Sequence, residues 1–251
     1  MERSGWLVSR PIAHRGLYDE ARGRPENSLS AFRYAAERGV PIELDVQLAR
    51  DGLLVVVHDT NLARVAGLDR PVSDLDRASL RRLRIGSDGE PIPTLGDALA
   101  AVACRVPIVI DVRRWRAGRS ADLERAVAGE ISGYSGELAL QSFDPLAVFR
   151  LRRLAGDRPV GQASGLLRSA GRVAGAIGRS MVTNFATRPD FVSYELAALP
   201  SRSTEFWRRR GIPVLAFTVS SGAAEARAAE LADNFFFSDY LPEIYRENAT
   251  P

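Results

Sequence analysis

The chain has 251 residues, of which 45% are hydrophobic and 26% are charged, and its formal net charge is +3. A chain of this size can bury a large core, either as one (β/α) barrel or as two small domains. No apolar run approaches the roughly 20 residues that cross a bilayer, and the 34 basic residues are all arginines scattered along the chain, so the sequence indicates neither stable membrane insertion nor a nucleic-acid partner.

The N-terminal segment and the single cysteine favour a cytoplasmic protein. Residues 1–10 lack the apolar stretch of a secretory signal peptide. Cys104 has no second cysteine with which to form an intrachain disulfide, as is usual in a reducing compartment. We therefore expect a cytoplasmic location. The sequence leaves the oligomeric state open, and a homo-oligomer is compatible with it.

The first β-like run ends at His14, and a helical pattern follows it after a loop. Asn27 or Ser28 can cap this helix, because both side chains accept a hydrogen bond from the first helical turn. Gly39 stands where the helix is expected to end.

Residues 41–58 are predicted to form a β-hairpin. Asp51-Gly52 lies between two apolar runs and favours a two-residue turn. In that register Asp45 lies opposite His58, and Glu43 lies on the same face because it is two residues from Asp45 on the strand. A slip of one residue would turn His58 away from this face. The return strand must be antiparallel, since a parallel neighbour needs a crossover of a dozen or more residues.

Eight further β-like runs remain when the return strand is set aside, and helical patterns separate them. The runs are 12–14, 42–46, 107–113, 138–143, 159–162, 181–185, 213–219 and 234–239. The helical patterns include 122–131, 145–155, 166–177, 203–210 and 222–231. Eight strand–helix alternations in about 250 residues are typical of an α/β protein with the (β/α)8 TIM-barrel fold. A doubly wound sheet is the alternative, but no GxGxxG turn follows the first strand.

The segment between the hairpin and the third barrel strand is longer than one crossover requires. Its helical patterns are 73–83 and 94–103, with proline and glycine residues between them. We therefore predict one domain over residues 1–251, with a small insertion at about 59–95 over the mouth of the barrel.

Three acids are expected at the C-terminal ends of neighbouring strands, where active sites of this fold lie. They are Glu43, Asp45 and Asp111. Three inward carboxylates would repel one another unless a cation lay between them, and an all-oxygen ligand set suits Mg²⁺ or Ca²⁺ better than zinc. The alternative is a network of ion pairs with Arg15 and Arg113 and no metal.

Basic side chains accompany these acids. The planar guanidinium groups of Arg15 and Arg113 suit a phosphate. The two histidines of the chain, His14 and His58, can act as general base and general acid. Together with a metal they indicate phosphoryl-ester chemistry. Further candidates are Gln141, Phe143 and Phe217 as pocket lining, and Glu26 as a residue behind the site that would also suit a helix start.

The same residues resemble the glycerophosphodiester phosphodiesterase family. The matching segments are Ile-Ala-His14-Arg15-Gly16, Pro25-Glu26-Asn27-Ser28, Glu43-Leu-Asp45-Val, Asp51-Gly52, Val-Val-His58-Asp59, Ile92-Pro93-Thr94-Leu95, Ser142-Phe143 and Ser238-Asp239-Tyr240. The resemblance implies a (β/α)8 barrel with a small inserted subdomain that hydrolyses glycerophosphodiesters to sn-glycerol 3-phosphate and an alcohol. It also implies that Glu43 and Asp45 ligate a divalent cation, that Arg15 binds the phosphate, and that His14 and His58 exchange protons.

Two places depart from the family pattern. Asp111-Val-Arg113 stands where the family usually has Glu-x-Lys, and Phe217 stands where it has a tryptophan. Two other functions therefore stay open. A lysophospholipase D-like activity would need an apolar groove beside Trp115 and Phe217, and a catalytically silent barrel would only bind phosphorylated ligands.

Overall fold

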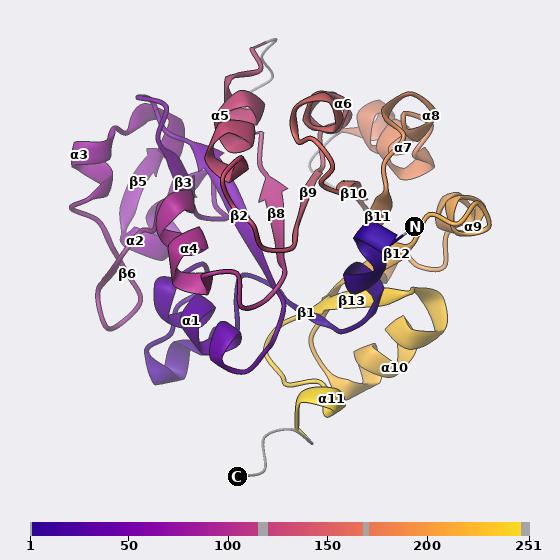
Figure 1. The fold of residues 1–251 in the computed structure, drawn as a ribbon, viewed down its shortest axis with the longest axis horizontal. Coiled ribbons are helices and arrows are strands. Elements are labelled where there is room, and N and C mark those ends of the chain that lie inside the picture. The colour runs from indigo at the N-terminus through magenta and orange to yellow at the C-terminus, as the bar shows by residue number, and fades with distance from the viewer. Residues whose placement is uncertain (1, 115–119, 168–170, 247–251) are drawn as a thin grey trace. The chain divides into compact units, whose positions relative to one another are not determined.

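The structure, a computed structural model, describes residues 2–114, 120–167 and 171–246. The chain has the predicted (β/α)8 barrel fold, with eight parallel strands in barrel order and helices between them (Figure 1). It divides into two compact units: an N-terminal unit, Ala13–Leu138, and a C-terminal unit, Met1–Ile12 with Ala139–Pro251. No helix of the described ranges is long and apolar enough to cross a membrane.

The N-terminal unit contains the first three barrel strands and the insertion. Its elements are β1 (Ile12–Ala13), η2 (Glu20–Arg22), α1 (Leu29–Glu37), β2 (Ile42–Leu48), β3 (Leu54–Val56), β4 (Asn61–Leu62), α2 (Ala63–Ala66), β5 (Leu68–Pro71), η3 (Val72–Asp74), α3 (Arg77–Leu80), β6 (Arg84–Ile85), β7 (Glu90–Pro91), α4 (Leu95–Val102), β8 (Ile108–Val112) and α5 (Asp122–Ile131). Strand β2 pairs in parallel with β8 and, through Ala13, with β1.

Helix α1 begins and ends close to the predicted positions. Ser28 is the N-cap, and its hydroxyl accepts a hydrogen bond from the Ala31 amide at 3.1 Å. Phe32 and Ala35 are buried, and α1 lies beside α4 in Figure 1. Asn27, the other predicted cap, has a different role, described below.

The hairpin forms as predicted, but its predicted register is wrong by one residue. Val46 pairs with Val56, so Asp45 lies opposite Val57 and not His58, and the Val57 amide donates to the Asp45 carbonyl at 3.0 Å. The loop between Ala49 and Leu53 has three residues and ends on Gly52 at a φ of +83°. A left-handed glycine is typical of this three-residue hairpin turn. Strand β3 ends before His58, so strand alternation no longer fixes the direction of that side chain.

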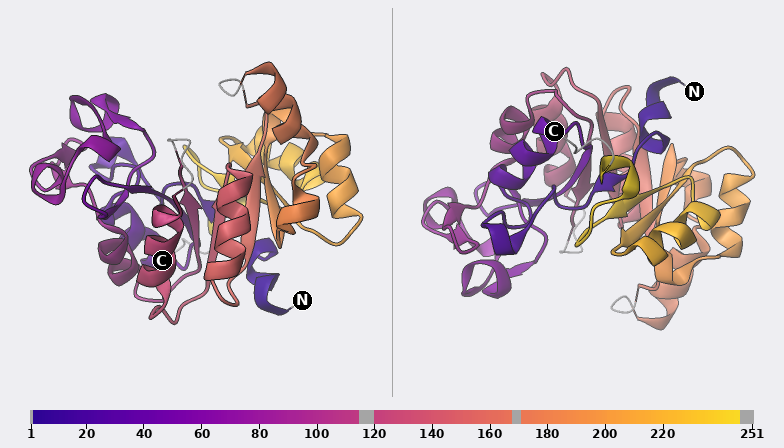
Figure 2. Two further views of the ribbon diagram at one scale, coloured as in Figure 1. Left: turned by 90° about the horizontal axis from the view of Figure 1, so that it is seen from above. Right: turned by 90° about the horizontal axis from the view of Figure 1, so that it is seen from below.

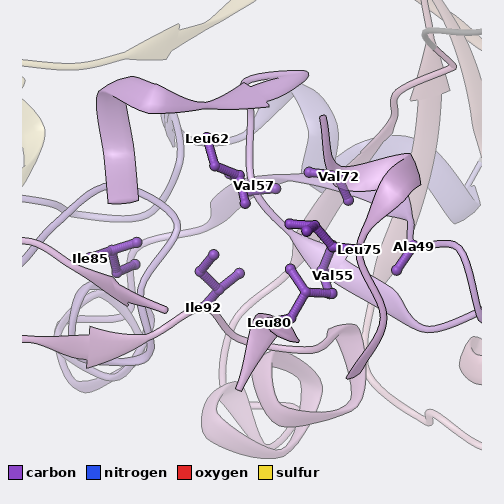
Figure 3. Packing of buried hydrophobic residues seen from close by; sticks show 9 residues of the cluster. All are labelled: Ala49, Val55, Val57, Leu62, Val72, Leu75, Leu80, Ile85 and Ile92. Atoms are coloured by element: carbon purple, nitrogen blue, oxygen red, sulfur yellow. The ribbon is translucent and has the colours of Figure 1, made fainter. Parts of the chain in front are cut away.

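The segment 59–95 packs around an apolar cluster of its own. Buried side chains from the insertion meet others from the hairpin (Figure 3): Ala49, Val55, Val57, Leu62, Val72, Leu75, Leu80, Ile85 and Ile92. Two small antiparallel sheets, β4–β5 and β6–β7, contribute Leu62 and Ile85 to this cluster. The predicted helix at 73–83 is wrong in extent, because only η3 and the four-residue α3 form there, with Asp76 capping α3. The second predicted helix is confirmed as α4.

The C-terminal unit contains five consecutive parallel strands with helices along their flank (Figure 2). Its elements are η1 (Glu2–Val8), β9 (Leu138–Ser142), α6 (Pro145–Leu154), β10 (Val160–Ser164), α7 (Arg172–Ser180), α8 (Asn184–Thr187), β11 (Phe191–Glu195), η4 (Leu196–Ala198), α9 (Arg202–Arg208), β12 (Val214–Val219), α10 (Gly222–Leu231), β13 (Asn234–Phe237) and α11 (Glu243–Arg246).

The sixth barrel strand lies later in the chain than predicted. Residues 181–185 lead into α8, and the strand is β11, which pairs with β10 and β12. Val182 and Phe185 are exposed, so the apolar character of that run did not reflect burial in a sheet. The helix predicted at 166–177 also begins later, as α7.

Candidate active site

Three carboxylates meet on the paired strands β2 and β8, two from the first half of β2 and one from near the end of β8. Glu43 and Asp45 lie on one face of β2 because they are two residues apart, and Asp111 lies opposite Asp45 in the parallel register of β8. One oxygen from each carboxylate lies within 4.8 Å of the others, and all three side chains are buried. The structure thus brings together the three acids that the sequence predicted at this position.

Burial and mutual repulsion perturb these acids unequally. Burial, together with the charges of Asp45 and Asp111, raises the pKa of Glu43 well above its usual range. Burial also raises the pKa of Asp111, to about 7. For Asp45 the same penalty of burial is outweighed by Arg113, His58 and Arg15, so its pKa is lowered. Full ionisation of all three carboxylates would therefore place more negative charge in the cluster than its protein surroundings neutralise.

The side chain of Asn27 makes two hydrogen bonds with Asp45. The Asn27 Nδ2 donates to Asp45 Oδ2 at 3.0 Å, and the Asp45 amide donates to Asn27 Oδ1 at 3.3 Å. Asn27 is buried and adopts a φ of +54°, a conformation that asparagine tolerates better than most residues. The residue expected as a helix cap is therefore a direct partner of the acidic cluster.

The segment after β1 brings His14 and Arg15 to the same acids. The Arg15 amide donates to Glu43 Oε2 at 2.9 Å, and His14 Nε2 lies 4.0 Å from that oxygen. The Arg15 Nε lies 3.6 Å from Asp45 Oδ2. Burial, followed by the positive charge of Arg15, lowers the pKa of His14 to about 3, so the imidazole is neutral at pH 7.

Arg113 spans two of the acids. Its Nη1 lies 3.0 Å from Asp45 Oδ1 and 3.1 Å from Asp111 Oδ2. The neighbouring carboxylates raise the pKa of this guanidinium against the opposing effect of burial. The sequence predicted that Arg113 faces a phosphate, and in this structure it contacts the acids.

His58 is fixed through the backbone and through Asp59. The Gln47 side chain, on the same face of β2 as the acids, donates from Nε2 to the carbonyls of Val57 and Asp59 at 2.8 Å and of His58 at 3.2 Å. The His58 Nδ1 lies 2.8 Å from Asp59 Oδ1. Burial lowers the pKa of His58 although the charge of Asp45 opposes this, so the two groups interact despite the slipped register.

Arg64, in α2 of the insertion, binds two carboxylates at the same time, those of Glu26 and Asp59. It donates from Nη1 and Nη2 to Glu26 at 3.1 and 2.6 Å, and from Nε to Asp59 Oδ2 at 2.6 Å. Glu26 also accepts from Arg15 Nη1 at 3.0 and 3.1 Å. Burial would raise the pKa of Glu26, but Arg64 and Arg15 together lower it. Burial would likewise raise the pKa of Asp59, which Arg64 and His58 lower to about 2.

The three predicted lining residues belong to the C-terminal unit. Phe143 and Phe217 pack edge to face with their ring centroids 5.8 Å apart, and Phe143 is 38% exposed. Gln141 is buried and accepts a hydrogen bond from the Ser193 hydroxyl at 2.6 Å. Trp115 lies outside the described residues.

Four contributors to the site were not identified from the sequence: Asn27, Gln47, Asp59 and Arg64. A signal existed for Gln47, which continues the alternation of Glu43 and Asp45, and for Asp59, which follows His58 directly. For Asn27 the signal was its place in the family-like segment Pro25-Glu26-Asn27-Ser28, although an asparagine before a helix is also a common cap. Arg64 gave no comparable signal, because an arginine in a short connection is common in proteins of every class.

Known proteins share both the sequence pattern and the fold. The model of the Glycerophosphoryl diester phosphodiesterase family matches residues 14–241. The putative glycerophosphodiester phosphodiesterase YhdW of Bacillus subtilis is 26% identical over 245 residues, 94% of this chain and 96% of that protein. A probable glycerophosphodiester phosphodiesterase 2 of Mycobacterium tuberculosis is 42% identical over 92 residues, which are 36% of this chain and 34% of that protein.

A solved structure of similar fold is a phosphodiesterase of Oleispira antarctica in complex with the product sn-glycerol-3-phosphate. It has a TM-score of 0.80 and 22% identity, and the match covers 96% of this chain and 97% of that one. This likeness agrees with the barrel described above. Because the family model extends over nearly the whole chain and includes both histidines and all three acids, the chain belongs to the glycerophosphoryl diester phosphodiesterase family.

Proposed function

We propose that this chain is a metal-dependent phosphodiesterase that hydrolyses glycerophosphodiesters to sn-glycerol 3-phosphate and an alcohol. Family membership supports the reaction class. The observation that carries the metal dependence is the buried cluster of Glu43, Asp45 and Asp111, whose oxygens lie within 4.8 Å of one another.

The donor set of this cluster fits a hard divalent cation. All three ligands are carboxylates, which suit Mg²⁺ or Ca²⁺. Asp111 Oδ1 is buried and accepts no hydrogen bond from any described residue, and burial raises the pKa of both Glu43 and Asp111. These features support a cation held by Glu43, Asp45 and Asp111. When bound, it would polarise a phosphoryl oxygen and offset developing negative charge.

Arg15 is assigned to the phosphate. Its backbone amide and guanidinium are tied to Glu43, Asp45 and Glu26, so the side chain is held beside the acids at a low entropic cost on binding. Arg113 is assigned to the same anion, and its contacts with Asp45 and Asp111 hold its guanidinium at the rim of the cluster. Both arginines would stabilise charge on the phosphoryl oxygens in the transition state.

His14 and His58 are assigned to proton transfer. His14 is neutral at pH 7, so its imidazole can take the proton of the attacking hydroxyl. Asp59, an acceptor only, keeps the His58 proton on Nδ1 and leaves Nε2 to exchange a proton with the alcohol oxygen.

Release of glycerol 3-phosphate from glycerophosphocholine tests this function. We expect activity with Mg²⁺ or Ca²⁺, none after EDTA, and restoration when the cation is returned. The His14→Ala variant should lose activity and keep its fold by circular dichroism. Full activity in EDTA would refute the metal, and full activity of His14→Ala would refute the proton-transfer role. Binding of glycerol 3-phosphate without turnover of any diester would instead identify a silent phosphate-binding barrel.

A lysophospholipase D-like reaction is the second candidate. The partly exposed Phe143 against Phe217 favours it, since an aromatic surface can hold an acyl chain. Lysophosphatidylcholine and glycerophosphocholine compared at equal concentration decide between the two. A lower kcat/KM for the lysolipid supports the water-soluble diester as the substrate.

The proposed enzyme consists of one domain over residues 1–251, with 59–95 as an insertion. The separate apolar cluster of that segment supports the insertion. A single cysteine supports a cytoplasmic location. The proposed partner is the small diester itself.

A further inference from the structure

We propose that Arg64 is a positioning residue that holds both the phosphate-binding arginine and one histidine of the active site. It does so by binding Glu26 and Asp59 at the same time. The inference rests on the proposed function, because it takes Arg15 and His58 as working groups. Its new content is that the insertion supplies a residue that orients both.

The contacts of Arg64 form two branches, and the first links it to Arg15 through Glu26. Each oxygen of Glu26 lies within hydrogen-bonding distance of both guanidinium groups: Arg15 at 3.0 and 3.1 Å, and Arg64 at 2.6 and 3.1 Å. A single carboxylate therefore joins two cations. Without Arg64, Glu26 could rotate about its own side-chain bonds and carry the guanidinium of Arg15 with it.

The second branch runs to His58. Asp59 uses its two oxygens separately, Oδ1 for the His58 Nδ1 at 2.8 Å and Oδ2 for the Arg64 Nε at 2.6 Å. The bond from Arg64 fixes the plane of the carboxylate, and the carboxylate fixes the plane of the imidazole. This is the arrangement in which a third group orients a histidine for proton transfer.

Only arginine can make both connections. Its Nε, Nη1 and Nη2 are all used here, and they point in fixed directions around one plane. A lysine would present its three donors at a single point and could not span two carboxylates in this way.

Neighbouring residues of the insertion fix the backbone position of Arg64. Leu62, two residues earlier, is buried in the apolar cluster of Figure 3, and the Asn61 side chain accepts a hydrogen bond from the Ala63 amide at 2.8 Å. Gly67 ends α2 at a φ of +67°. The backbone of Arg64 is thus anchored, while 54% of its side chain is exposed. Exposed ion pairs contribute little to stability, so a purely structural Arg64 would matter little for activity.

Kinetics of Arg64→Met, with Arg208→Met as the matched control, tests the inference. Arg208 is also an exposed arginine, and it binds Asp233 through Nε and Nη2 at 2.9 Å in the C-terminal unit. We expect Arg64→Met to lower kcat about tenfold, because it loosens His58, which transfers a proton. The variant should also raise KM for glycerophosphocholine several-fold, because it loosens Arg15, which binds the phosphate. Arg208→Met should leave both constants unchanged. The two variants should show equal, small changes in Tm.

Double variants separate positioning from other roles. Glu26→Gln should mainly raise KM, and Asp59→Asn should mainly lower kcat. Adding Arg64→Met to either should cause less than the product of the single effects, because the branches share Arg64. Arg64→Lys should recover only part of the activity. Multiplicative effects, or an Arg64→Met enzyme within twofold of the parent, would overturn the inference. If the inference on Arg64 fails in this way while His14→Ala and EDTA still abolish activity, the proposed function stands and only the positioning role of Arg64 is refuted.

Discussion

Replacing Asn27 by glycine should weaken the fold and the metal site together. Glycine keeps the φ of +54° without strain and removes only the side chain that binds Asp45 at 3.0 and 3.3 Å. Losing a hydrogen bond to a buried charged group costs about 1.5–3 kcal/mol, and the extra freedom of glycine in the unfolded chain adds about 0.5–1 kcal/mol. We therefore expect a loss of about 2–4 kcal/mol in the free energy of unfolding, the sum of these two effects.

Asn27→Ala serves as the companion variant. It removes the same hydrogen bonds and adds a left-handed backbone strain of about 1–2 kcal/mol. Urea unfolding at pH 7 without metal should therefore rank the wild type above Asn27→Gly, and Asn27→Gly above Asn27→Ala. For a chain of this length, each kcal/mol corresponds to about 2–4 °C in Tm.

The same variants should bind the cation less tightly. A partner that orients a ligating carboxylate is typically worth about 10–100-fold in metal affinity, so the concentration of Mg²⁺ or Ca²⁺ at half-maximal activity should rise by that factor. A loss of stability below about 0.5 kcal/mol in Asn27→Gly, which is the range of an ordinary surface substitution, would refute the structural part of this reasoning. An unchanged metal dependence would refute the part that concerns the cation.

Three further predictions follow from other contacts. Mg²⁺ or Ca²⁺ at a hundredfold excess over Kd should add about 2.7 kcal/mol to the free energy of unfolding and so raise Tm. Differential scanning fluorimetry should show this rise in the wild type and none in Asp45→Asn. The folded pKa of Asp59, about 2, lies below its ordinary 3.8, so its contribution to stability is present above pH 3.8 and is lost as the pH falls through 2. The difference in the free energy of urea unfolding between wild type and Asp59→Asn should be constant from pH 7 to 4, about 1 kcal/mol after screening, and should decrease steadily from pH 4 to 2. Leu62→Ala empties a buried position in the insertion and should cost about 3 kcal/mol in urea unfolding, whereas a loss below about 1 kcal/mol would mean that the cluster collapses around the gap.

The hairpin shows how far the sequence could be used to predict the fold. Asp51-Gly52 marks a turn, but the pair suits both a two-residue loop and a three-residue loop that ends on a left-handed glycine. Local sequence does not choose between them, so the register was missed by one residue. The antiparallel return itself was predictable, because the connection is too short for a crossover.

The sixth strand was missed for a different reason. Residues 181–185 are as apolar as a buried strand, yet Val182 and Phe185 are exposed. The true strand, β11, contains Ser193 and Glu195 and so gives a weaker apolar signal. Periodicity cannot separate such short runs without knowledge of their neighbours.

The acids and histidines of the site were predictable, and the groups that orient them were mostly not. Glu43 and Asp45 share a strand face by spacing alone, and barrel topology brings Asp111 beside them. Arg64 reaches Glu26 across 38 positions of sequence, from a four-residue helix that has no strong pattern. Contacts of that kind depend on how an irregular insertion folds.

Gln47 restricts how this barrel could diverge. Its amide nitrogen faces three successive backbone carbonyls at the point where the chain leaves β3. A glutamate, although nearly the same shape, would set a negative oxygen against those three dipoles, and the path that carries His58 would have to change. We therefore expect that a glutamine-to-glutamate substitution at this position is not tolerated, because the path of residues 57–59 depends on the Nε2 donor of Gln47.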